Sequence, residues 1–105
     1  MPKTYFVVRS TIADPALRKK FDHWYGTDHM PWALKEFKCE KAWRLWSEVD
    51  PSIHEARYQF ADLETCNAAV NSEGMKALKA DFDRVFPTVT RTRDVLVMAD
   101  EQAVS

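Results

Sequence analysis

The amino-acid sequence predicts an α+β fold in which a four-stranded antiparallel sheet carries helices on one face. Four segments rich in β-branched and aromatic residues are typical of strands, and two amphipathic segments are typical of helices. Their order along the chain is β-α-β-β-α-β. The 105 residues suffice for one domain and not for two, so we expect a single domain over residues 1–105.

The first strand and the first helix are marked by composition and by end signals. The segment TYFVVRS, residues 4–10, has strand composition. In the segment that follows, Asp14 suits a helix N-cap, Pro15 suits the first helical position, and Gly26 suits the left-handed residue that closes a helix. The apolar positions that share one face of this helix are Leu17, Phe21 and Trp24.

The stretch YGTDHMPW, residues 25–32, predicts a break between this helix and a shorter helical piece that starts at Pro31. Met30 precedes a proline, which biases it toward an extended conformation. We therefore expect His29 to lie in a bend, free to turn toward a pocket. Asp28 is expected either to cap the short piece or to join the substrate site.

Two strands, a second helix and a last strand complete the domain. The segments 39–49 and 53–63 predict strands joined by the turn DPS. Asp62 predicts the N-cap of the second helix, which we expect to be interrupted near Gly74. The apolar stripe of that helix is Met75, Leu78, Phe82 and Val85, and Pro87 ends it. The last strand is TVTRTRDVLVMA, and the tail 99–105 is expected to be frayed.

This element order is the ferredoxin-like arrangement, with both helices on one face of the sheet. The first strand is nevertheless apolar on both faces, and the next strand carries Trp43 on one face and Trp46 on the other. Because helices cover only one face, we expect the second face to be covered by the same sheet of another subunit. The sequence therefore predicts a homodimer with two-fold symmetry.

Charge and composition exclude several classes of function. A formal net charge of −1 gives no field for attracting nucleic acid or an anionic membrane. No apolar run approaches the roughly 18 residues that span a bilayer, and the N-terminus shows no signal-peptide pattern, so we expect a cytoplasmic protein. In that reducing compartment, Cys39 and Cys66 are expected to be small buried hydrophobic residues.

The length, the element order and the segment FDHWYGTDHMP together resemble the dimeric α+β barrel superfamily, and within it the EthD-like branch. In that branch an aromatic pair late in the first helix is followed by His-x-Pro, which here corresponds to Trp24, Tyr25, His29 and Pro31. The resemblance implies two sheets paired as a barrel and a pocket between sheet and helices. Superfamily members include muconolactone isomerases, small polyketide cyclases, cofactor-free quinol monooxygenases and stress-responsive proteins.

His29 is the first candidate for chemistry. An unperturbed imidazole titrates near pH ~6.5, so it can act as acid or base at neutral pH, and a well-placed one contributes about 10²–10⁴-fold to rate. The alternative is a loop histidine that packs or caps a helix end. The resemblance favours a catalytic role for His29, with Tyr58 or Tyr5 as a second proton donor.

Several other residues are candidates for binding a substrate. We expect Trp24, Trp32 and Trp43 to form a pocket wall, although an ordinary core has the same composition. Arg9 follows Tyr5 and Val7 on one strand face. If that face points at the helices, Arg9 is expected to hold a substrate oxyanion; if it points at the dimer seam, Arg9 is expected to pair with an acidic residue.

The remaining polar residues give weaker signals. Arg91 and Arg93 are expected on the polar side of an edge strand, and His23 on the solvated side of a helix. His54 is expected to reach either the pocket mouth or water. The three histidines lack metal-ligand spacing, and a chain with two glycines has no phosphate-binding loop, so we expect neither metal nor cofactor.

The sequence thus predicts a cofactor-independent enzyme that acts on an apolar aromatic or polyketide-type small molecule. We expect proton transfer by His29 in an isomerase, dehydratase, cyclase or related lyase step. One alternative is a cofactor-free or haem-handling monooxygenase. The other is a non-catalytic, stress-responsive protein that binds a ligand in the same pocket.

Overall fold

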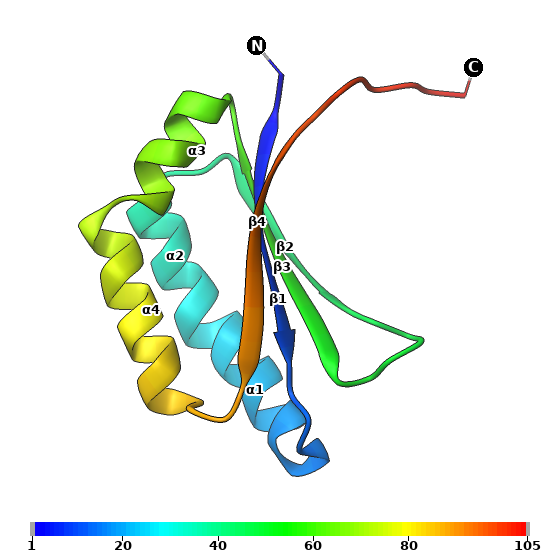
Figure 1. Cartoon of the computed structure of the whole chain (residues 1–105), viewed down its shortest axis with the longest axis vertical. Coiled ribbons are helices and arrows are strands. Elements are labelled where there is room, and N and C mark those ends of the chain that lie inside the picture. Colours follow the sequence, from blue (N-terminus) through cyan, green and yellow to red (C-terminus); the bar gives the residue numbers. More distant parts are fainter. Residues whose placement is uncertain (1, 105) are drawn as a thin grey trace.

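The computed structural model describes residues 2–104, and it has the predicted α+β, ferredoxin-like fold. The four strands are β1 (Thr4–Thr11), β2 (Lys41–Trp46), β3 (Ile53–Phe60) and β4 (Thr90–Val97). They form one antiparallel sheet in the order β2-β3-β1-β4. Figure 1 shows the sheet nearly edge-on with the helices gathered on one side of it. The other face of the sheet is uncovered in this chain.

The helical elements form two runs, each packed on the same face of the sheet. The first run is η1 (Pro15–Leu17), α1 (Arg18–Trp24), η2 (Tyr25–His29) and α2 (Met30–Phe37). The second is α3 (Leu63–Val70) and α4 (Glu73–Val85). None of the helices within residues 2–104 has both the length and the apolar composition needed to cross a membrane.

The predicted break at residues 25–32 is wrong. The backbone stays helical from α1 through α2, and residues 25–29 form a single π-helical turn, in which the Met30 N–H donates to the Tyr25 carbonyl five residues earlier. Met30 is helical (φ −67°, ψ −42°) rather than extended. A π turn widens the helix by one residue, and this wider turn accommodates Pro31, which has no N–H to donate.

Gly26 does not close a helix, because no glycine has a positive φ within residues 2–104. The absence of a side chain at Gly26 instead lets another side chain approach the helix closely. A Cβ atom at Gly26 would lie 2.9 Å from the Arg44 guanidinium, which crosses over the helix from β2. The left-handed residue that ends this helical run is instead Lys38, with φ 52°.

The second helical run begins at Asp62 as predicted, since the Asp62 carboxylate accepts a hydrogen bond from the Thr65 N–H at 2.8 Å. Its interruption lies at Asn71 and Ser72 rather than at Gly74. Ser72 caps α4, and its hydroxyl accepts from the Met75 N–H. A local cap therefore determines where α4 starts, and the glycine falls inside its first turn.

The core lies between the sheet and the helices. Strand residues alternate, so one set of side chains from each strand faces α1, α2 and α4 and the other set faces the uncovered side. The buried core side chains contributed by the strands are Phe6, Val8, Ala56, Tyr58 and Phe60. Cys66 is buried among them as predicted, Cys39 is only half-buried, and both thiols are free.

Candidate functional site

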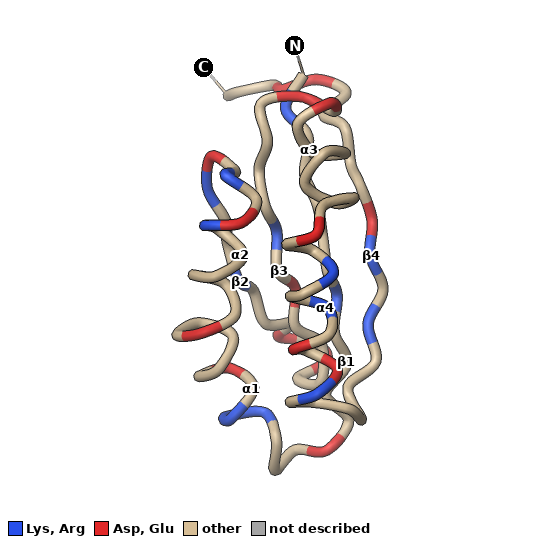
Figure 2. Tube along the Cα trace, turned by 90° about the vertical axis from the view of Figure 1, so that its left-hand side faces the viewer, with Lys and Arg blue, Asp and Glu red and all other residues tan. Residues whose placement is uncertain are grey.

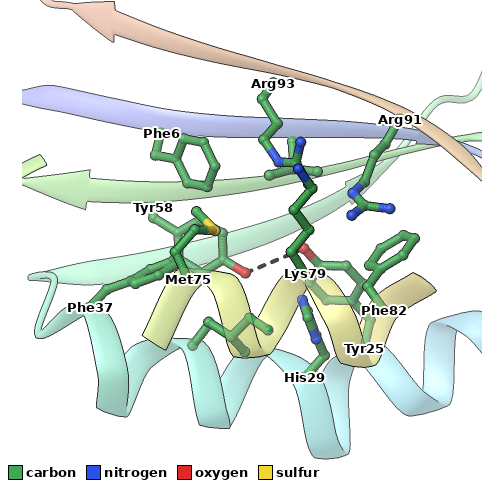
Figure 3. Close-up of a pocket in the computed structure, with 13 residues that line it drawn as sticks. Phe6, Tyr25, His29, Phe37, Tyr58, Met75, Lys79, Phe82, Arg91 and Arg93 are labelled. Carbon is green, nitrogen blue, oxygen red and sulfur yellow. Dashed lines mark hydrogen bonds between the residues drawn. The ribbon is translucent and has the colours of Figure 1, made fainter. Parts of the chain in front are cut away.

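A small cavity lies in this core, between α4 on one side and β1, β3 and β4 on the other, with the π turn at its floor. Figure 3 shows its aromatic walls, including Phe6, Phe37 and Phe82. The cavity volume is about 30 Å³, which is room for one or two water molecules. A small-molecule ligand therefore enters only if lining side chains move.

His29 reaches this cavity because the π turn rotates it inward. Its side chain is buried, stacks on the Trp24 ring at 4.6 Å between centroids, and meets the edge of the Tyr25 ring at 4.8 Å. The Nδ1 atom has no hydrogen-bond partner among the described residues. A buried polar atom without a partner is unfavourable unless a ligand or water supplies one.

Burial lowers the pKa of His29 to about 4; Asp81 opposes this shift and Arg91 adds to it. The charged imidazolium is disfavoured because little water and few dipoles solvate it there. His29 is therefore neutral at pH 7. In that state it can accept a proton from a bound molecule, but it is not a ready proton donor, which narrows the acid-or-base role expected from the sequence.

Two tyrosine hydroxyls lie beside His29. Tyr25 on the π turn and Tyr58 on β3 are both buried, and their hydroxyl oxygens are 3.3 Å apart (Figure 3). Burial raises the pKa of Tyr25 to about 12 and raises the pKa of Tyr58 well above its usual value. Both phenols therefore stay protonated at neutral pH and can act as hydrogen-bond donors.

Three cationic side chains also line the cavity, namely Lys79 from α4 and Arg91 and Arg93 from β4. The Arg91 guanidinium donates to Asp83 at 2.7 Å and lies 4.0 Å from the centre of the Phe82 ring. From the sequence, both arginines are expected on the polar side of an edge strand. The alternation Thr-Arg-Thr-Arg does put them on one face, but only the packing of α4 shows that this face lines a cavity.

The other predicted residues on the first helical run lie around the cavity without entering it. Trp24 packs behind His29 and is buried. Trp32 is half-buried on α2, where its Nε1–H donates to Glu36 at 3.3 Å. Asp28 is exposed and accepts a hydrogen bond from the Thr27 hydroxyl, and α2 has no side-chain cap. The structure thus brings His29 and Tyr58 together but leaves Trp32 and Asp28 outside.

Tyr5, Trp43 and Arg9 lie on the uncovered face of the sheet, away from the cavity. The rings of Tyr5 and Trp43 are 6.3 Å apart, and the Arg9 guanidinium is 3.7 Å from the Glu55 carboxylate. Of the two alternatives for Arg9, the structure places it on the face away from the helices. Roles for these three residues in a substrate site stay predictions.

A second buried histidine was missed by sequence reasoning. His54 on β3 is fully buried between the rings of Phe21, Tyr25 and Trp46, and neither ring nitrogen has a hydrogen-bond partner among the described residues. Burial lowers the pKa of His54 to about 4, with a further lowering from Arg44 that Asp22 opposes. A histidine near the start of a strand does not by itself indicate burial, because the rings that cover His54 come from other elements, namely α1, η2 and β2.

Within residues 2–104, no three His, Cys, Asp or Glu side chains gather closely enough to form a metal-binding group. The donors of the cavity are instead one neutral imidazole, two phenols and three cations. This set can accept a proton, donate hydrogen bonds to an oxygen atom and stabilise negative charge.

No known protein-family model matches the sequence, and no curated protein is similar to it. Solved structures with the same fold do exist. A variant of SnoaB, a cofactor-independent oxygenase from Streptomyces nogalater, superposes with a TM-score of 0.73 at 11% identity, covering 96% of this chain and 97% of that one. An ethyl tert-butyl ether degradation (EthD) family protein from Bacillus halodurans gives 0.68 at 16%, covering 97% and 100%.

A third solved structure is a dimeric ferredoxin-like protein from an uncultured marine organism, with a TM-score of 0.70 and 16% identity over 97% of this chain and all of that one. At these sequence identities the similarity shows a shared fold and nothing further. The chain therefore has the fold predicted from its element order, the one shared by EthD family proteins and by dimeric ferredoxin-like proteins.

Proposed function

We propose that this chain is a cofactor-independent enzyme that removes a proton from an apolar, aromatic or polyketide-type small molecule. The observation that carries the proposal is the buried, neutral His29, whose Nδ1 atom has no hydrogen-bond partner within residues 2–104 and which lies on the wall of an aromatic cavity. A neutral imidazole held in such a place is a general base.

The two phenols provide the complementary half of the reaction. When a proton leaves a carbon next to a carbonyl group, negative charge develops on the carbonyl oxygen. Tyr58 and Tyr25 remain protonated and line the same cavity, so either hydroxyl can donate a hydrogen bond to that oxygen. The proton on His29 can then return to another atom of the substrate.

Such proton transfer leads to isomerisation, dehydration, cyclisation or a related lyase step. The small volume of the cavity requires Met75 and Lys79, the flexible side chains on its α4 wall, to move aside when the ligand enters. Both are long and unbranched, so they change rotamer at low cost. The rings of Phe6, Phe37 and Phe82 would then contact the apolar body of the substrate.

A second candidate is a cofactor-free monooxygenase, in which the same carbanion reacts with O₂. The similarity in fold to SnoaB, described as a cofactor-independent oxygenase, supports the monooxygenase as a second candidate function. Both candidates share the first step, abstraction of a proton by His29. Oxygen consumption in an electrode assay during turnover separates the oxygenase from the isomerase or lyase.

The first step can be tested without knowing the natural substrate. The probe is 2-tetralone, a small aromatic ketone with acidic C–H bonds, and the measurement is enzyme-dependent deuterium incorporation from D₂O by mass spectrometry. His29→Ala should lower that rate by about 10²–10⁴-fold. The matched control is His23→Ala, an exposed histidine on α1, which should leave the rate unchanged.

Retention of the wild-type exchange rate in His29→Ala would remove His29 from catalysis. Binding of 2-tetralone without any enzyme-dependent exchange would favour the third hypothesis, a non-catalytic ligand-binding protein.

The uncovered sheet face belongs to this proposal as a homodimer interface, because Trp43, Leu45 and Leu96 expose 37%, 49% and 40% of their surface there. A dimer formed across that face would leave the cavity, on the other side of the sheet, open to solvent.

A further inference from the structure

The mouth of the cavity is formed by positively charged side chains. Of the residues that line the cavity, only Lys79 and Arg93 are exposed to solvent, and Arg91 and Met75 are half-buried beside them. The remaining lining side chains are buried. A molecule that enters the cavity past these exposed side chains therefore meets two cations.

The three cations that line the cavity differ in whether they have a carboxylate partner. Arg91 is paired with Asp83. Lys79 and Arg93 have no carboxylate partner among residues 2–104. Lys79 from α4 and Arg93 from β4 both line the cavity (Figure 3), so two cations from different elements lie at its mouth. Figure 2 shows that Lys and Arg positions occur along both β4 and α4.

Two like charges at the mouth of one cavity repel each other. The arrangement becomes favourable when an anion lies between them. Burial and the neighbouring Arg91 lower the pKa of Arg93, and Asp83 and Tyr25 oppose this shift. Asp81, on the same helix as Lys79, is paired with Arg84. The mouth thus keeps an excess of positive charge beside an apolar interior.

We propose that Lys79 and Arg93 form a binding site for the carboxylate of an aromatic acid, with Arg91 as a third donor and the aromatic ring directed inward toward His29. A planar carboxylate matches the fork of an arginine side chain and gains charge-assisted hydrogen bonds from it. The ring then lies against Phe82 and the other aromatic walls. This assignment rests on the proposed function, and it narrows the substrate class from any apolar molecule to an aromatic carboxylic acid.

The test compares benzoate with benzamide, which has the same shape and no charge. Dissociation constants are measured by ¹H–¹⁵N NMR titration of the full chain at fixed ionic strength, for the wild-type protein and three variants. We expect wild-type protein to bind benzoate at least about tenfold more tightly than benzamide. Arg93→Met and Lys79→Met should each remove most of that preference while leaving benzamide binding unchanged.

The matched control is Lys76→Met, which removes a lysine from the same helix that is exposed and paired with Glu73. It should keep the full preference for benzoate. Equal affinity for the two probes, no binding of either probe, or an undiminished preference in both Arg93→Met and Lys79→Met would each overturn the proposal. Retained folding of the variants is verified by their NMR spectra.

The failure of this inference and the failure of the proposed function give different results. His29→Ala should keep the preference for benzoate, because His29 does not contact the carboxylate in the proposed pose. If the protein binds benzoate selectively but shows no proton exchange with 2-tetralone, the anion site stands and the enzyme proposal falls. If exchange occurs without charge selectivity, the enzyme proposal stands and the anion site falls.

Discussion

The two faces of the single sheet differ in the burial and the partners of their polar side chains. On the helix-covered face, His29 and His54 are buried and neutral, and several of their nitrogen atoms lack protein partners. On the uncovered face, Arg9 and Arg57 both lie against Glu55, at 3.7 Å and 3.0 Å, so both arginines have a carboxylate partner, although Arg57 Nε has no hydrogen-bond partner among the described residues. Alternate residues of the same strand, β3, supply both arrangements.

This difference shows what each face is suited to do. Paired charges with aromatic neighbours, such as the Tyr5 and Trp43 rings, suit a surface that packs against another surface of the same kind. Unpaired polar atoms in an apolar cavity suit a ligand that completes their hydrogen bonds. The comparison predicts that substitutions on the two faces affect different measurements.

The largest expected effect is on folding stability, and it comes from the helix-covered face. Phe21 is fully buried and packs against six other rings, those of Trp24, Tyr25, Trp46, His54, Phe82 and Phe86. We expect Phe21→Ala to lower the free energy of unfolding by about 3–5 kcal/mol in urea titrations. Trp43→Ala, on the uncovered face, should lower it by less than about 1 kcal/mol at protein concentrations where the chain is monomeric. Similar losses in the two variants would contradict the assignment of the core to one face.

The second effect is a pH dependence of stability. His29 and His54 have a pKa of about 4 in the folded chain against an ordinary value of 6.5. Between these values the unfolded chain binds more protons, so the free energy of unfolding falls as pH falls from about 6.5 to about 4. Each histidine accounts for a loss of about 3 kcal/mol over that window.

The substitution His54→Leu should remove about half of that pH dependence, because one of the two buried histidines is then absent. Urea unfolding at several values between pH 4 and pH 7 measures the slope. The control is His23→Leu, which changes an exposed histidine and should keep the wild-type slope. An unchanged slope in His54→Leu would show that His54 gains a proton in the folded chain without penalty.

The third effect concerns association through the uncovered face. Leu45 on β2 is 49% exposed there, and Leu34 on α2 is 38% exposed on the helical side. If the uncovered face forms a homodimer, Leu45→Asp should raise the dimer dissociation constant by roughly 10–100-fold, as expected for a charge placed in an apolar contact. Leu34→Asp should leave it unchanged. Sedimentation velocity over a range of concentrations measures both, and a wild-type chain that stays monomeric throughout would end the dimer proposal.

Local signals in the sequence predicted the strands, the helix caps and the faces of each element. Period-two alternation placed Trp43 and Trp46 on opposite faces, as the structure shows, and Asp62 was identified as a cap from its type and position alone. The same kind of signal failed between Tyr25 and Pro31. A glycine and a proline five residues apart are typical of a break, yet a π turn accommodates the proline and the Arg44 side chain uses the space at the glycine.

The candidate site was predictable only in part. His29 and Tyr58 were singled out from the sequence and lie on one cavity, whereas Tyr25, Arg91 and Arg93 were not proposed for the site. Arg93 and Lys79 are 14 positions apart in the chain, on two elements whose pairing is set by how α4 packs on the sheet. No local pattern encodes that distance.

The sequence by itself determined the order and type of the elements and which residues of one element share a face, because periodicity and capping are properties of residues a few positions apart. The tertiary structure alone decided which polar residues lose contact with water. His54 and His23 are the same residue type, each on a regular element, but three rings from distant segments enclose His54 while His23 stays exposed. Burial depends on neighbours that are remote in sequence, and in this protein burial sets the charge state of His29, on which the proposed chemistry depends.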